Sequence, residues 1–198
     1  MNLTTDQLDA VKELINIGVG QAAGMLNEMI EFHIRLQIPV VKFLSPKLLQ
    51  KELGERIGCE QLSTVKLDFG GSFVGTAELV FPTESAATLV AVLTGEEPGS
   101  PDLDSLKIGT LSEVGNILLN GVMGSISNML DQPLKYAVPS YTEDTIDNLL
   151  PFKNNHDQAT VLLAEARFDI EELQLQGDIV LFFDVGSFEV LLEAIELV

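Results

Sequence analysis

Three polar residues near the start of the chain, Asp9, Glu13 and Asn16, stand at spacings of four and three. In an α-helix these positions fall within about 60° of one another, so they share one face, and Gly20 continues it. Two carboxylates and a carboxamide could do chemistry together, because an amide both donates to and accepts from one water molecule without adding charge. A solvated helix face can look the same, so the pattern alone leaves both interpretations open.

The same Glu and Asn spacing recurs at Glu113 and Asn116. Residues 8–39 align without a gap with residues 108–139, and both motifs keep the polar pair while core positions change in type. This retention favours a shared task over an ordinary solvated face. The pairs that recur at an offset of 100 are Glu13 and Glu113, Asn16 and Asn116, Ile17 and Ile117, Gly24 and Gly124, Met29 and Met129, and Pro39 and Pro139.

A second alignment, at an offset of 102, relates residues 75–89 to residues 177–191. The sequence therefore predicts a single domain, 1–198, built from two repeats. The repeats are 1–95 and 105–198, joined by an acidic Pro and Gly linker at 96–104. So small a unit buries little surface alone, so we expect the two copies to pack around a pseudo-twofold axis.

Hydrophobic periodicity and turn residues give a similar order of elements in both halves. Helices are expected at 4–29, 45–53, 83–93, 105–130, 142–150 and 186–197. Extended segments are expected at 32–43, 65–69, 75–81, 134–139, 159–168 and 173–183. The fold class is therefore α/β (α+β), with a mixed or antiparallel sheet flanked by long helices.

Several residues refine the ends of these elements. Thr4 and Gln7 form a capping-box pattern at the first helix, and Thr83 is a plausible cap for a later one. Pro39 inside an extended segment indicates a sheet edge or a bulge. Thr110 and Glu113 could form another capping box, and a helix that began there would use Glu113 as a cap.

Composition excludes several classes of function. The formal charge of −19 repels nucleic acid and anionic membranes, and favours a partner with a basic patch. Cys59 is the single cysteine, and His33 and His156 lie far apart, so no metal-ligand spacing is visible. The start has no basic, apolar leader and no apolar run has transmembrane length, which predicts a cytoplasmic protein without membrane insertion.

The chain resembles the CheC-like family of CheY-phosphate phosphatases, whose motif is Asp/Ser-x3-Glu-x2-Asn-x22-Pro. Asp9, Glu13, Asn16 and Pro39 match it completely. Glu113, Asn116 and Pro139 match it with a departure at the first position, where Gly109 stands. The second motif therefore lacks the carboxylate or hydroxyl that the family has at its first position.

The resemblance implies a mechanism and a set of partners. Asn16 and Asn116 would orient a water that attacks the aspartyl phosphate of a CheY-type response regulator, and Glu13 and Glu113 would pair with the regulator's lysine. Asp9 would support the first site. The chain would need no cofactor of its own, because the Mg²⁺ belongs to the regulator. The duplication favours a monomer, since single-motif relatives dimerise.

Two other functions stay open. One is a non-catalytic binding module, like the middle domain of flagellar switch proteins, and the other is a regulator that docks the CheD deamidase. A dinucleotide loop at Gly18-x-Gly20 is disfavoured, because no strand precedes it. Asp68, Glu78 and Asp178 are interpreted as solvent-facing strand residues, and Phe182 and Phe183 as core.

Overall fold

A computed structural model describes residues 4–29, 34–57, 61–97, 101–146, 160–170, 173–184 and 186–195. The helices are α1 (Thr5–Met29), α2 (Pro46–Ile57), α3 (Thr83–Thr94), α4 (Pro101–Met129) and α6 (Ser187–Ile195). The strands are β1 (Ile34–Leu44), β2 (Gln61–Gly71), β3 (Gly75–Pro82), β4 (Leu134–Tyr136), β5 (Ser140–Thr145), β6 (Thr160–Ile170) and β7 (Leu173–Phe183). The predicted mixed α/β class is confirmed.

Within the described residues, the strands form one seven-stranded antiparallel sheet in the order β1-β6-β7-β3-β2-β4, and β5 also pairs with β2. The strand order is alike when it is followed inward from either edge. From one edge it runs β1, β6, β7, and from the other it runs β4 or β5, then β2, then β3. The two runs meet at the central pair of β7 and β3. Two packed repeats would produce this order. The division into repeats 1–95 and 105–198 stays a prediction.

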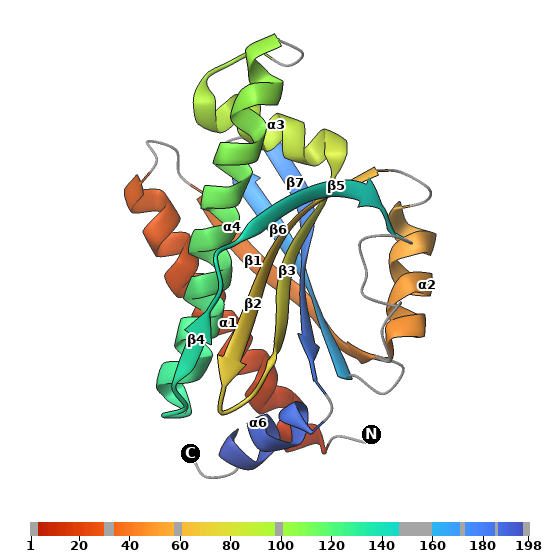
Figure 1. The fold of residues 1–198 in the computed structure, drawn as a ribbon, viewed down its shortest axis with the longest axis vertical. Coiled ribbons are helices and arrows are strands. Elements are labelled where there is room, and N and C mark those ends of the chain that lie inside the picture. The colour runs from red at the N-terminus through yellow and green to blue at the C-terminus, as the bar shows by residue number, and fades with distance from the viewer. Residues whose placement is uncertain are drawn as a thin grey trace.

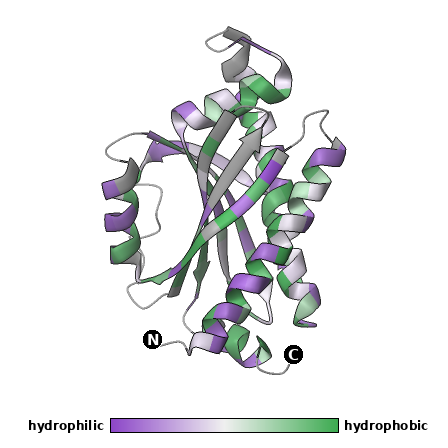
Figure 2. Cartoon of the chain, turned by 180° about the vertical axis from the view of Figure 1, so that it is seen from behind, coloured by the Kyte–Doolittle hydropathy of each residue, from purple (hydrophilic) through white to green (hydrophobic). Residues whose placement is uncertain are grey.

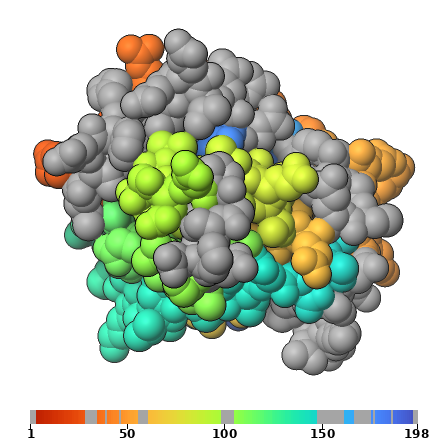
Figure 3. Space-filling model, turned by 90° about the horizontal axis from the view of Figure 1, so that it is seen from above, coloured from red at the N-terminus to blue at the C-terminus, as the bar shows by residue number. Residues whose placement is uncertain are grey.

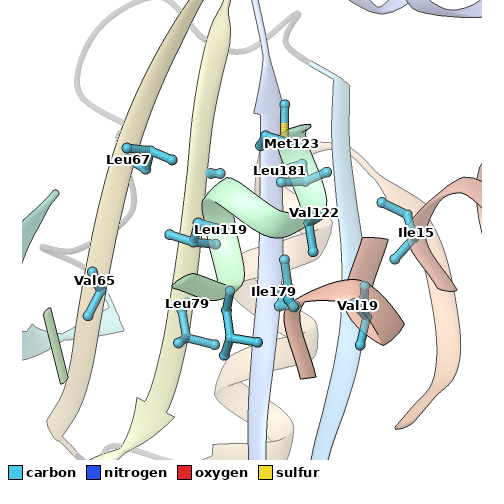
Figure 4. Close-up of a cluster of buried hydrophobic side chains, with 14 of the residues drawn as sticks. Ile15, Val19, Val65, Leu67, Leu79, Leu119, Val122, Met123, Ile179 and Leu181 are labelled. Carbon is cyan, nitrogen blue, oxygen red and sulfur yellow. The ribbon is translucent and has the colours of Figure 1, made fainter. Parts of the chain in front are cut away.

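Helices α1 and α4 lie side by side across one face of the sheet, and α2 lies on the other face (Figure 1). The main core fills the space between the helix pair and the sheet. Figure 4 shows Ile15 and Val19 of α1 and Leu119 of α4 in this layer. They meet strand residues such as Leu79 and Leu181, and all five side chains are buried. The apolar stripe predicted for the first helix therefore faces the core.

Two glycines set how closely α1 and α4 approach. A Cβ at Gly18 would lie 2.8 Å from the Cα of Val122, and a Cβ at Gly121 would lie 2.6 Å from the Cβ of Ala22. Close backbone approach, and not a dinucleotide loop, explains Gly18. Gly20 is exposed, and a Cβ there would meet nothing within 4 Å.

A smaller core lies under α2 on the opposite face, where Leu49 and Leu53 meet strand residues such as Val80 and Val180. Glu78 and Asp178 are also buried, at 1% and 3% exposure. The interpretation of these two as solvent-facing was therefore wrong, because strand alternation cannot show that a helix covers the second face. Asp68 is exposed, as expected.

Three local predictions were wrong as well. Residues 142–145 belong to strand β5, which pairs with β2, where a helix was expected; residues 147–150 lie outside the described residues. Helix α4 begins at Pro101, inside the predicted linker. Thr83 does not cap α3, because its hydroxyl donates to the carbonyl of Gln61 instead, at 2.8 Å.

Candidate active site

The first motif lies on the outer face of α1. Asp9, Glu13 and Asn16 are all exposed, while Ile15 and Val19 between and beyond them are buried. The capping box fixes the start of this helix: the Thr4 backbone N–H donates to Gln7 Oε1 at 3.0 Å, and the Gln7 N–H donates to Thr4 Oγ1 at 3.2 Å. Figure 2 shows hydrophilic and hydrophobic residues alternating along the helices, as this amphipathic pattern requires.

Within the motif, the three side chains do not bond to one another. Asp9 forms an exposed ion pair with Lys12 at 3.5 Å. Among the described residues, Glu13 has no ion pair and Asn16 has no side-chain hydrogen bond. Their carboxylate and carboxamide therefore remain available to a partner that approaches this face.

Glu13 also lines an apolar groove of about 300 Å³. The groove runs between α1, the end of α4 and α6, and its lining residues are Ala10, Glu13, Leu14, Ile17, Met129, Leu130 and Ile195. An acidic side chain thus stands beside a surface that can bury apolar atoms of a partner.

The second motif lies on α4, which continues without a break from Pro101 through Gly109. Glu113 is therefore in the helix interior, and the alternative in which it caps a helix starting at Thr110 is wrong. Glu113 is exposed, and Asn116 is half-buried. A groove of about 490 Å³ adjoins Glu113. Its lining residues are Leu26, Leu93, Thr94, Ser105, Leu106, Gly109, Thr110, Glu113, Val114 and Ile117.

The two grooves use equivalent positions of the two halves. Ala10, Glu13, Leu14 and Ile17 line the first, and the residues 100 positions later line the second. Glu13 neighbours the end of α4, whereas Glu113 neighbours Leu26 near the end of α1. The antiparallel helix pair therefore presents one glutamate near each of its ends.

One contact distinguishes the second motif. The amide Nδ2 of Asn120 donates to Oδ1 of Asn116 at 2.6 Å, one helical turn along α4. Gly20 occupies the equivalent position in α1. The sequence contains this difference between Gly20 and Asn120, but the hydrogen bond to Asn116 is visible only in the structure.

The two motif prolines lie at the two edges of the sheet. Pro39 lies in edge strand β1, where the register with β6 shifts between Gln37 and Val40. Pro139 lies between β4 and β5, the two short strands along the other edge. The prediction of an edge or bulge at Pro39 is confirmed.

A partly buried polar network near the second motif was missed from the sequence. Glu143 of β5 forms an ion pair with Lys107 of α4 and accepts hydrogen bonds from Tyr141 and Ser63, at 2.6 Å and 3.1 Å. Burial raises the pKa of the Glu143 carboxyl, but the bonds from Lys107, Tyr141 and Ser63 outweigh it and lower the pKa overall. Residues so far apart in the sequence gave no signal. Seen from above, the green part of α4 adjoins the teal residues that follow it in the chain (Figure 3).

The described residues offer neither a cluster of metal ligands nor a membrane-spanning helix. No group of three or more His, Cys, Asp or Glu that could hold a metal ion occurs in the part of the chain that the structure describes. Within that same part, every helix is too short or too polar to cross a lipid bilayer.

The predicted resemblance to the CheC-like family is confirmed by the similarity of the sequence and of the fold to known proteins. Residues 7–42 match the CheC-like family model, a span that contains Asp9, Glu13, Asn16 and Pro39. The chain is 23% identical over 203 residues to the CheY-P phosphatase CheC of Bacillus subtilis, and the alignment covers 96% of this chain and 94% of that protein.

Solved structures show the same fold. FliY of Thermotoga maritima matches with a TM-score of 0.79 at 19% identity, covering 99% of this chain and 98% of that one. The FliM middle domain of H. pylori matches with a TM-score of 0.64 at 14% identity, covering 97% and 99%. The second motif lies outside the span that the family model matches.

Proposed function

We propose that this protein is a phosphatase for the aspartyl phosphate of a CheY-type response regulator. The observation that carries the proposal is the exposed Glu13 and Asn16 pair on α1, inside the span that matches the CheC-like family. The similarity over nearly the whole chain to a CheY-P phosphatase supports the same activity. The strongly acidic chain suits a partner with basic side chains at its binding surface.

In this mechanism the regulator supplies most of the chemistry, since its acyl phosphate lies beside a bound Mg²⁺ and a lysine. Asn16 enters that site and orients a water in line with phosphorus. The water oxygen bonds to phosphorus, the bond from phosphorus to the aspartate oxygen breaks, and inorganic phosphate and a free carboxylate result. Positioning the water and excluding solvent supply about 3–5 kcal/mol, roughly a hundredfold to a thousandfold or more in rate.

Glu13 pairs with the regulator's lysine and fixes the docking. The apolar groove beside Glu13 gives the partner a surface to bury around that ion pair, where exclusion of water strengthens it. Glu113 and Asn116 form the second site by the same logic, with their own groove. Asp9, which has no counterpart at Gly109, supports docking at the first site.

The test is release of inorganic phosphate from a phosphorylated CheY-type regulator, measured for wild type and for Asn16→Ala, Asn116→Ala and the double variant. Each single variant should lower the rate, and the double variant should return it to the regulator's own decay. Asn128→Ala is a matched control, because Asn128 is exposed on α4 outside both motifs. If the wild-type protein leaves the decay rate of the phosphorylated regulator unchanged, the proposed activity is wrong. If the double variant is fully active, the assignment of Asn16 and Asn116 is wrong.

The second candidate function is partner binding without hydrolysis, because the FliM middle domain has the same fold. A regulator that docks CheD belongs to this class and is compatible with phosphatase activity. Binding of the phosphorylated regulator with no faster release of phosphate favours the second candidate. Light scattering of the free protein tests the expected monomer.

A further inference from the structure

We propose that Asn120 is a positioning residue that holds the Asn116 carboxamide ready before a partner arrives. The inference rests on the proposed function, because it concerns how one of the two water-orienting asparagines is prepared. Its basis is the 2.6 Å hydrogen bond from Asn120 Nδ2 to Asn116 Oδ1, between residues one turn apart on α4. Both side chains are half-buried, which limits competition from solvent.

The first motif lacks this support. Gly20 stands where the repeat pattern places the equivalent of Asn120, and it has no side chain to donate a hydrogen bond. Asn16 is exposed and has no side-chain hydrogen bond among the described residues. Asn16 therefore becomes ordered when the partner binds, whereas Asn116 is ordered in the free protein.

The bond leaves the reactive capacity of Asn116 intact. A carboxamide oxygen has two lone pairs and its nitrogen has two hydrogens. Asn120 occupies one lone pair, so Oδ1 can still accept from a water, and Nδ2 can still donate to a phosphoryl oxygen. Asn120 thus restricts the rotamer of Asn116 without blocking the groups that the proposed mechanism needs.

The two motifs therefore differ at both ends. The first has Asp9 one turn before its glutamate and Gly20 one turn after its asparagine. The second has Gly109 and Asn120 at those positions. Loss of the leading carboxylate in the second motif is accompanied by a gain of support for its carboxamide.

A side chain that is already ordered does not add its ordering cost to the reaction barrier. One hydrogen bond of ordinary strength corresponds to about a fivefold change in rate. We expect this change in kcat and not in KM, because Asn116 acts on the water while Glu113 and the groove account for docking.

The experiment isolates the second site with Asn16→Ala and compares Asn120, Asn120→Ala and Asn120→Gln. We expect Asn120→Ala to lower kcat about fivefold with KM unchanged. Asn120→Gln should restore the rate, because a glutamine at i+4 still reaches Asn116 with its amide. An unchanged or faster kcat in Asn120→Ala overturns the inference.

A reciprocal variant transfers the contact to the first site. Gly20→Asn, made with Asn116→Ala, should raise kcat, since a side chain at position 20 meets no neighbouring atom within 4 Å of its Cβ. A lower kcat in this variant contradicts the inference.

A second measurement does not depend on phosphatase activity. NMR order parameters of the side-chain NH₂ groups should be higher for Asn116 than for Asn16 in the wild type. Asn120→Ala should lower the Asn116 value to that of Asn16. Equal order parameters before and after the change overturn the positioning role. A drop in order without any phosphate release supports the positioning contact and rejects the proposed function of the second site.

Discussion

Two glycines two positions apart on the long α1 helix, Gly18 and Gly20, should respond oppositely to the same substitution. Gly18 is buried against α4, where an added Cβ would lie 2.8 Å from Val122 Cα and 3.1 Å from the Val122 carbonyl oxygen. Gly20 is exposed, with nothing within 4 Å of an added Cβ. Both lie in the interior of α1.

The magnitudes follow from two terms. Replacing a helical glycine by alanine stabilises by about 1 kcal/mol through helix propensity. At Gly18 the methyl group meets backbone atoms, which cannot rotate away, so overpacking costs about 3 kcal/mol. We therefore expect a net loss of about 2 kcal/mol for Gly18→Ala and a gain of about 1 kcal/mol for Gly20→Ala.

Thermal unfolding followed by circular dichroism measures the difference. For a domain of this size, Gly18→Ala should lower Tm by about 4–8 °C and Gly20→Ala should raise it by about 2–4 °C. The sign is the decisive outcome. If Gly18→Ala is as stable as Gly20→Ala, the two helices do not approach as closely as described, and the placement of the two motifs on one helix layer is wrong.

Three further predictions concern stability. Thr4→Ala should lower the free energy of unfolding in urea by about 1 kcal/mol, because the Gln7 N–H loses the hydroxyl to which it donates. An unchanged free energy of unfolding would argue against the capping box. Lys107→Met should lower the free energy of unfolding by about 2 kcal/mol, which is less than the loss of one partner of a fully buried ion pair because Glu143 is 33% exposed. The matched control is Lys51→Met, which removes an exposed ion pair and should change the free energy of unfolding by less than about 0.5 kcal/mol. Burial raises the pKa of Glu78 to about 7 against an ordinary 4.5, with Lys66 lowering it and Asp68 raising it. The stability that the protonated Glu78 contributes is fully present below the ordinary pKa of 4.5, and it is lost as the pH rises through about 7. The free energy of unfolding of Glu78→Gln should therefore rise by about 3 kcal/mol relative to that of the wild type between about pH 4.5 and pH 8. A difference independent of pH would show that Glu78 is not buried in its acid form.

Local patterns predicted most of the secondary structure correctly. The capping box at Thr4, the apolar stripe through Ile15 and Val19, and the extended segments at 65–69 and 75–81 each depend on neighbours in the chain, so they can be predicted without tertiary information. The exposed face with Glu13 and Asn16 follows from the same stripe.

Long-range contacts account for the errors. Residues 142–145 were expected to be helical, but β5 pairs with β2, and partners about 80 positions away in the sequence decide that state. Glu78 is buried on a sheet face whose apolar residues also pack against α2, and the strand's own sequence does not show that this face is covered. The start of α4 at Pro101 is compatible with proline in a first helical turn, although the acidic residues around it favoured a linker.

The positions of the two motif prolines have a consequence for behaviour at high protein concentration. An exposed edge strand offers unpaired N–H and C=O groups to the edge of another molecule, which leads to association and fibrils. Pro39 removes a donor from β1 and coincides with its irregular register, and Pro139 separates the short strands β4 and β5 on the opposite edge. Neither edge therefore presents a long regular strand. Each motif proline protects the sheet edge on which it lies from pairing with a strand of another molecule.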